Sequence, residues 1–134
     1  MASYAGKLLR IDLSSRRIET QATSDYSGAY LGGRGMATKI YWDECSPADS
    51  AFSPEVPLII ALGPLAGVPA VGGSRWGIFS KTPLRTPHSF SHGNLGGTFG
   101  AEVKYAGYDG IIITGKADSP VFISIEDDRV LINP

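Results

Sequence analysis

The sequence has few of the residues that build metal centres and covalent cross-links. Its one cysteine, Cys45, excludes an internal disulfide and fits a reducing compartment. Its two histidines, His88 and His92, lie four positions apart in a segment that proline and glycine break, so no helix brings them to one face. A metal site built by this chain alone is therefore not expected. No acid at recognisable spacing accompanies Ser91 and His92, so a hydrolase triad is not supported.

An excess of either charge is also missing. Lys and Arg number 12 against 13 Asp and Glu, for a net charge of -1, and they are scattered along the chain. Nucleic acid and anionic membranes need a concentrated basic face, so neither is an expected partner. No apolar run approaches membrane-spanning length, and the first residues lack the apolar core of a signal peptide. We expect a cytoplasmic protein.

The composition is otherwise that of an ordinary globular chain, with 43% hydrophobic and 19% charged residues. A length of 134 residues predicts a single domain, 1–134, with one sizeable core. Glycine is the exception: 17 glycines are well above the usual frequency of roughly 7%. Their concentration between Gly28 and Gly115 indicates close backbone approaches rather than a flexible linker.

Hydrophobic patterning predicts an α+β fold, mostly β, in mixed or antiparallel sheets with two or three short helices and with the glycine-rich loops on one side. Strands are expected at Lys7 to Leu13, Arg17 to Gln21, Leu58 to Leu62 (buried on both faces), Arg75 to Ser80 (Trp76 and Ile78 on one side), Gly110 to Thr114, Val121 to Ile125 (a fourth core strand) and Val130 to Ile132. Helices are expected from Ser24 or Asp25 to Tyr30, from Met36 to Glu44 after an interruption at LGGRG, and from Thr98 to Ala106. Loops are expected at Ser46 to Pro57, Gly67 to Gly73 and Thr82 to His88.

The stretch SHGNLGG before the third helix is where the glycines gather. Gly93, Asn94, Gly96 and Gly97 leave the backbone free to approach a ligand without an intervening Cβ. A glycine-rich turn that leads into a helix directs backbone N–H groups at an anion. We therefore predict an anionic cofactor with a phosphate near these residues. The pattern matches neither the dinucleotide fingerprint nor the phosphate loop, and a tight turn without a ligand would have the same spacing.

Only one side chain outside this stretch is a good candidate for anion binding. Arg75 follows Gly72, Gly73 and Ser74, and its planar fork of donors suits a phosphate, although a surface arginine at a strand end would look the same. Other polar residues have simpler interpretations: Arg34 packs its stem and pairs with a carboxylate, Cys45 packs, Asp109 serves a turn or cap, and Glu102 and Lys104 are solvated. Nothing supplies a nucleophile, a base and an oxyanion site together, which indicates a binding platform.

Four motifs in order give the sequence a specific resemblance. They are LGGRGMA at Leu31, LIIALGPLAG at Leu58, GGSRWGIFSKTPL at Gly72 and GNLGGTFGAEVKYAGYDGIIITGKADSPVFI at Gly93. Together they cover nearly the whole chain, which resembles the N-terminal domain of the aldehyde ferredoxin oxidoreductase family, the tungsten or, less often, molybdenum enzymes with a bis-pyranopterin cofactor. The resemblance implies the β-rich α+β domain that forms a base under the metal and its two pterins.

The resemblance also implies roles for single residues. Arg75 matches the arginine that contacts the pterin, and Asn94 matches the asparagine whose backbone carbonyl reaches the magnesium that bridges the pterin phosphates. Gly96 matches a glycine whose backbone touches the pterin, and its neighbours Leu95 and Gly97 belong to the same predicted cofactor-binding set. A carbonyl ligand suits magnesium, which prefers oxygen. No catalytic residue is predicted. The segment from Lys81 to Asn94 departs from the family by its greater length and its two histidines.

The family's iron-sulfur cysteines and proton-transfer residues belong to later helical domains, so the chain is expected to be an excised part of a longer enzyme or a short subunit that works with a partner. The complete enzyme would oxidise aldehydes to carboxylic acids with ferredoxin as electron acceptor, whereas this chain alone is predicted to be inactive and without cofactor. The alternatives are the same domain in an aromatic acyl-CoA reductase subunit, and a non-catalytic module that binds protein or self-associates as a homo-oligomer.

Overall fold

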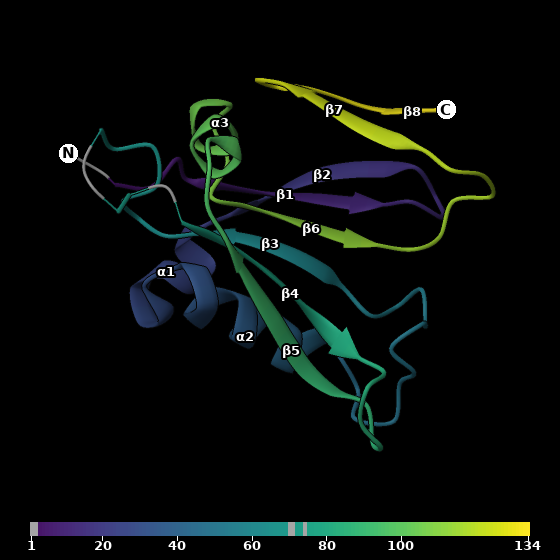
Figure 1. Ribbon diagram of the computed structural model, residues 1–134. Helices are drawn as coiled ribbons and strands as arrows, with labels where there is room; N and C mark the ends of the chain where they lie inside the picture. Colours follow the sequence, from purple (N-terminus) through teal and green to yellow (C-terminus); the bar gives the residue numbers. More distant parts are fainter. Residues whose placement is uncertain (1–2, 70–71, 74) are drawn as a thin grey trace.

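A computed structural model of the chain describes residues 3–69, 72–73 and 75–134. The predicted loop at Gly67 to Gly73 and the residue before Arg75 therefore fall partly outside the described residues. The described strands are β1 (Lys7–Asp12), β2 (Arg17–Ala22), β3 (Leu58–Leu62), β4 (Trp76–Thr82), β5 (Ser89–Leu95), β6 (Gly110–Thr114), β7 (Phe122–Glu126) and β8 (Arg129–Asn133) (Figure 1). The described helices are α1 (Ser24–Tyr30), α2 (Gly33–Glu44) and α3 (Phe99–Tyr105).

Six of these strands form one mixed sheet in the order β2-β1-β6-β3-β4-β5, and β7 and β8 form a separate hairpin. The pairing of β1 with β6 is parallel, whereas the other pairs in the sheet are antiparallel. The α+β class is thus confirmed, as is the predicted N-terminal hairpin, whose turn places Arg16 at φ 56°. Among the described residues, no helix is long and apolar enough to cross a membrane.

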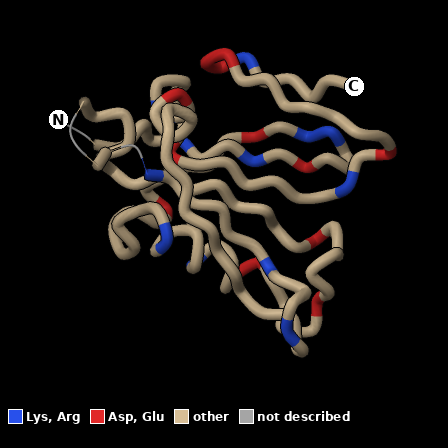
Figure 2. The backbone as a smooth tube through the Cα atoms, viewed as in Figure 1, with Lys and Arg blue, Asp and Glu red and all other residues tan. Residues whose placement is uncertain are grey.

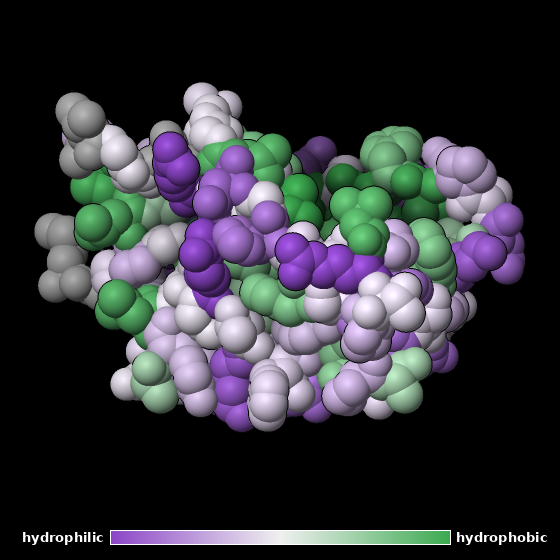
Figure 3. Space-filling model, turned by 60° about the horizontal axis from the view of Figure 1, so that its bottom comes forward, coloured by the Kyte–Doolittle hydropathy of each residue, from purple (hydrophilic) through white to green (hydrophobic). Residues whose placement is uncertain are grey.

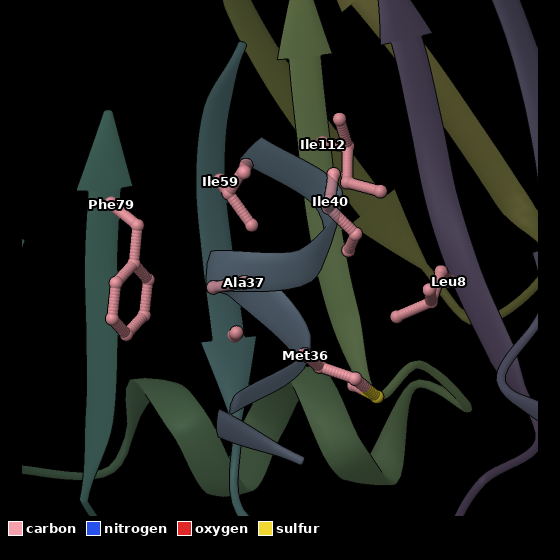
Figure 4. Packing of buried hydrophobic residues seen from close by; sticks show 8 residues of the cluster. Leu8, Met36, Ala37, Ile40, Ile59, Phe79 and Ile112 are labelled. Atoms are coloured by element: carbon pink, nitrogen blue, oxygen red, sulfur yellow. The ribbon is translucent and has the colours of Figure 1, made fainter. Parts of the chain in front are cut away.

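Helices α1 and α2 cover one face of the sheet (Figure 1). Met36, Ala37 and Ile40 project from α2 toward side chains of four strands, as the sticks of Figure 4 show. This helix presents its apolar residues at a spacing of three and four, which places them on a single face. The buried cluster consists of Leu8, Met36, Ala37, Ile40, Ile59, Ala61, Phe79 and Ile112.

Helix α3 and the β7–β8 hairpin pack on the opposite face. The predicted fourth core strand, Val121 to Ile125, was wrong in its placement, because β7 pairs only with β8 and lies over the sheet rather than within it. Its residues still bury apolar surface, since Ile123 and Ile125 pack against the second cluster. That cluster is made of Leu9, Ile11, Leu62, Ala66, Val103, Tyr108 and Ile111.

Several elements differ from the sequence prediction. Strand β5 was missed, because its glycine and polar residues are typical of a loop, yet it pairs with β4 at seven positions from Ser89 to Leu95. Helix α2 begins at Gly33 rather than Met36, so the GRG triplet forms its first turn. Strand β3 is less buried than predicted, with Leu58 at 40% exposure.

The first turn of α2 needs glycine for steric reasons. A Cβ on Gly35 would lie 2.4 Å from the carbonyl oxygen of Tyr30, the last residue of α1. We expect Gly35→Ala to lower the free energy of unfolding by about 1–3 kcal/mol, because the helix must move to relieve the contact. The matched control is Gly28→Ala in α1, where a Cβ meets open space and the better helix former should add roughly 0.5–1 kcal/mol. Urea denaturation measures the free energy of unfolding of both variants. Equal changes in the two would contradict the steric role of Gly35.

Candidate functional site

The structure brings Arg75 and Asn94 to the same end of the sheet. Strands β4 and β5 pair with Trp76 opposite Leu95 and Gly77 opposite Asn94. Arg75 immediately precedes the first residue of β4, and the indole nitrogen of Trp76 donates to the carbonyl oxygen of Gly96 at 3.0 Å. The two sequence motifs are therefore neighbours in space, although 19 positions separate these residues in the chain.

This end of the sheet is open to solvent. Arg75 and all residues from Ser91 to Phe99 are exposed. Arg75 forms none of the ion pairs found among the described residues, so its guanidinium has no carboxylate partner there. Charges of both signs are spread over the rest of the fold (Figure 2). A free guanidinium beside bare backbone can bind an anion through charge-assisted hydrogen bonds.

The glycines at this end are not explained by packing within the chain. A Cβ on Gly93, Gly96 or Gly97 would meet no atom within 4 Å. Gly77 and Gly100 differ, because a Cβ there would approach the rings of Phe79 and Trp76 to 2.6 and 3.1 Å. Gly97 has φ 80°, which favours glycine, but Gly93 and Gly96 have no such conformation. Gly93 lies inside β5, where glycine is typical of close approach by another backbone or a ligand, whereas Gly96 and Gly97 follow the strand and leave its end without side chains.

The edge position of β5 adds free backbone groups to the same surface. Because β5 has a neighbour on one side only, about half of its N–H and C=O groups have no strand partner. Helix α3 begins at Phe99, one residue after the start predicted from the sequence and four after the end of β5, but its seven residues give it a small dipole. The backbone of β5, more than the helix, is therefore what the fold offers to an anion or a metal-bound phosphate.

Helix α3 is held in place by a buried ion pair that the sequence interpretation missed. Lys104 was assigned to a solvated face, yet its side chain is 11% exposed and pairs with Asp109, which is 1% exposed. The Asp109 carboxylate also accepts hydrogen bonds from the backbone nitrogens of Ala5 and Gly6 and from the Thr23 hydroxyl, at 3.0, 2.8 and 2.6 Å. Asp109 was expected to serve a turn or cap, but it caps no helix and instead binds backbone N–H groups near the start of the chain.

These partners set the charge of Asp109. Burial alone would raise the pKa of its carboxyl, but the hydrogen bonds from Lys104, Thr23 and the backbone of Ala5 and Gly6 outweigh it, and the net pKa is lowered. The carboxylate is therefore ionised at neutral pH. It joins the N-terminal segment, the start of α1 and the end of α3 at the end of the sheet that carries Arg75.

The remaining candidate residues lie elsewhere. Nδ1 of His88 accepts a hydrogen bond from the Ala51 backbone nitrogen at 2.8 Å, which is a structural role. His92 is exposed on β5 with its ring 6.0 Å from that of Phe79. Arg34 lines a cavity of about 550 Å³ with Tyr30 and Trp42. It forms none of the ion pairs among the described residues, so the expected pairing with a carboxylate was wrong. Three metal-ligating side chains do not come together anywhere in the described part of the chain.

Comparison with known proteins identifies the family. The model of the aldehyde ferredoxin oxidoreductase N-terminal domain matches residues 8–134. This chain belongs to the aldehyde ferredoxin oxidoreductase family. The tungsten-containing aldehyde ferredoxin oxidoreductase of Pyrococcus horikoshii is 42% identical over 133 residues, which cover 98% of this chain and 22% of the relative.

Two further members of the family differ in what they act on. The WOR-like subunit of an aliphatic sulfonate oxidoreductase from Pyrococcus furiosus is 39% identical over 140 residues, covering 98% of this chain and 21% of that one. In the solved active-site complex BamBC of benzoyl coenzyme A reductase, bound to 1,5-dienoyl-CoA, one chain matches with a TM-score of 0.93 and 38% identity. The match covers 98% of this chain and 20% of that chain. The chain thus spans about a fifth of the length of these oxidoreductases.

Proposed function

We propose that this chain is the cofactor-facing domain of a tungsten-containing oxidoreductase that, when complete, oxidises aldehydes to carboxylic acids with ferredoxin as electron acceptor. The observation that carries the proposal is the bare glycine surface beside the unpaired Arg75, which packing within the chain does not explain. Similarity to tungsten-containing enzymes supports a tungstopterin as the group that covers it. Bound there, the cofactor would supply the redox chemistry, and the chain would bind and orient it.

The residues at the end of β4 and β5 fit such a group. The guanidinium of Arg75 suits a pterin phosphate, for which it offers two parallel donors. The backbone carbonyl of Asn94 lies on an edge strand and suits a magnesium ion at the phosphates. Gly96, with Leu95 and Gly97 on either side, would let the main chain touch the pterin without a Cβ between them.

The complete activity requires residues that this chain does not contain. Its single cysteine cannot hold an iron-sulfur cluster, which takes four thiolates, so we place that cluster in further domains of the enzyme. The four-fifths of each relative that have no counterpart here are long enough to supply them. These further helical domains are therefore the chain's first partner, and the chain alone should be inactive and free of cofactor.

A second candidate function is the same domain within a reductase of aromatic acyl thioesters. The TM-score of 0.93 with a chain of the benzoyl coenzyme A reductase complex favours it as a specific alternative. The two candidates share the cofactor surface and differ in the substrate and in whether the substrate is oxidised or reduced. Turnover of an aldehyde, as opposed to an aromatic acyl thioester, by the complete protein would decide between them.

The cofactor site can be tested by the substitution Arg75→Ala. The chain would be produced alone and fused to the remaining four-fifths of the Pyrococcus horikoshii relative, in a host that makes tungstopterin. We expect tungsten and pterin to co-purify only with the fusion, and Arg75→Ala to reduce loading about 10-fold or more, since charge-assisted hydrogen bonds contribute about 1.5–3 kcal/mol. Arg85→Ala, another exposed arginine, is the matched control. Equal loading of both variants, or full activity of the chain alone, would overturn the proposal.

A further inference from the structure

A second cavity lies at the opposite end of β4 from Arg75. Its volume is about 370 Å³, within the usual range for small-molecule sites. Lys81 lies six positions from Arg75 along the strand, which at about 3.3 Å per residue places it roughly 20 Å away. The cavity is thus distinct from the proposed cofactor surface. It is lined by Tyr41, Trp42, Cys45, Pro47, Lys81 and His88.

Lys81 brings a buried positive charge to this cavity. It is only 6% exposed, and its ammonium group donates to the carbonyl oxygens of Ser46 and Pro47 at 2.8 and 3.1 Å. A lysine has three N–H donors, so one remains. None of the ion pairs among the described residues involves Lys81, and the nearby Asp49 carboxylate instead accepts the Ser46 backbone N–H at 2.8 Å. The hydrogen-bond partners of Lys81 are thus two neutral carbonyl oxygens, and an anion at the remaining N–H would add a charge-assisted hydrogen bond.

Two further residues of the lining, Tyr41 and His88, carry donor groups. Because Nδ1 of His88 accepts the Ala51 N–H, the neutral ring carries its proton on Nε2, which is a donor. The Tyr41 hydroxyl stays protonated, because burial, then the adjacent Cys45 thiol and the charge of the Asp49 carboxylate raise its pKa to about 12. Aromatic rings and Pro47 supply the rest of the lining, and Trp42 forms an exposed rim. Purple, white and green residues are mixed over the face of the molecule that Figure 3 shows, without one large apolar area.

We propose that this cavity binds a small organic monocarboxylate. Its carboxylate would accept hydrogen bonds from Lys81 and His88, and its apolar body would lie against Tyr41, Trp42 and Pro47. The class of ligand follows from the lining, because Lys81 and His88 carry N–H donors there and the aromatic rings and Pro47 form most of the rest. This site is independent of the cofactor surface, so a test can overturn one proposal without affecting the other.

Cys45 provides the readout, since it lines the cavity and is the only cysteine of the chain. The rate of its alkylation by N-ethylmaleimide, a neutral reagent, would be followed by mass spectrometry of the 134-residue chain with increasing phenylacetate. We expect saturable protection of at least 5-fold, and a dissociation constant at least 10-fold weaker for the neutral analogue phenylacetamide. Equal protection by both compounds, or protection by neither, would overturn the proposal.

Two substitutions locate the bound carboxylate. His88→Asn retains an acceptor for the Ala51 N–H but removes the Nε2 donor, and should weaken phenylacetate binding about 10-fold, as expected for one charge-assisted hydrogen bond. His92→Asn, on the exposed face of β5, is the matched control and should bind like the original chain. Lys81→Met should abolish protection, and circular dichroism confirms that the variant is folded. Should that variant unfold, His88→Asn decides alone. Unchanged binding by His88→Asn would refute the assignment.

Discussion

Replacing Asp109 by alanine should lower the free energy of unfolding by about 3–5 kcal/mol, the usual cost of removing one partner of a buried ion pair. The substitution leaves the ammonium of Lys104, whose side chain is 11% exposed, without its counter-charge. It also removes the acceptor for the backbone nitrogens of Ala5 and Gly6 and for the Thr23 hydroxyl. Each buried donor left without a partner costs about 1–3 kcal/mol, so the loss is large for one side chain.

The control for this variant is an exposed ion pair. Asp128 bonds to Lys7 at 2.6 Å, and its side chain is 85% exposed. Asp128→Ala should therefore cost at most about 1 kcal/mol, as is typical of surface pairs. Chemical denaturation of both variants measures the difference. A loss from Asp109→Ala as small as that from Asp128→Ala would show that the buried pair does not hold the fold together.

The same carboxylate makes stability depend on pH, with a defined sign. Because the pKa of Asp109 is lowered in the folded state, its contribution is fully present above the unfolded pKa of about 3.9. The contribution is lost as the pH falls from there through the folded pKa. Asp109→Asn keeps the size of the side chain but does not ionise, so its stability should fall less steeply over this acid range. Denaturation midpoints between neutral pH and acid measure the two slopes.

Phe79→Ala should have an effect of similar size, about 3–5 kcal/mol, because it opens a cavity in the core. Phe79 is 1% exposed and belongs to the cluster between α2 and the sheet (Figure 4). Its ring also lies 6.1 Å from that of Phe90 and close to the α-carbon of Gly77, where a Cβ would approach to 2.6 Å. The surrounding backbone therefore leaves little freedom to fill the space.

An exposed phenylalanine provides the comparison. Phe52 is 79% exposed, so Phe52→Ala should change the free energy of unfolding by roughly 0.5 kcal/mol or less. For Phe79→Ala the denaturant concentration at the midpoint of unfolding should fall. The slope of the free energy of unfolding against denaturant concentration should stay the same, as expected when only the stability changes. If the two variants unfolded at the same midpoint, the α2 face of the sheet would not be the main core.

The sequence was sufficient for most elements because their patterns are strong. Runs such as LIIAL and GIIIT are short, apolar and bounded by glycine or proline, and both became strands at the centre of the sheet. Strand β5 could not be predicted, because an edge strand need not be apolar and SFSHGNL is broken by glycine. Its conformation comes from pairing with β4, which is a contact between segments and not a local preference.

Part of the candidate site could also be predicted, because its residues form a strong local pattern in the sequence. The glycines and Arg75 form a local pattern, and strand pairing brings them together as neighbours. The buried Asp109 could not be predicted, since its partners Ala5, Gly6 and Thr23 lie 86 to 104 positions away and no periodicity connects them. The hydrogen-bond acceptors of Lys81 could not be predicted for the same reason, because these carbonyl groups belong to a loop more than 30 positions earlier.

The central claim is that the end of β4 and β5 receives an anionic cofactor. The most direct test is a structure of the complete protein that contains this chain, determined with tungstopterin bound. We expect the guanidinium of Arg75 in contact with a pterin phosphate and the backbone carbonyl of Asn94 beside the magnesium ion. A cofactor bound on another face of the domain, with Arg75 and Gly93 to Gly97 still open to solvent, would contradict the claim.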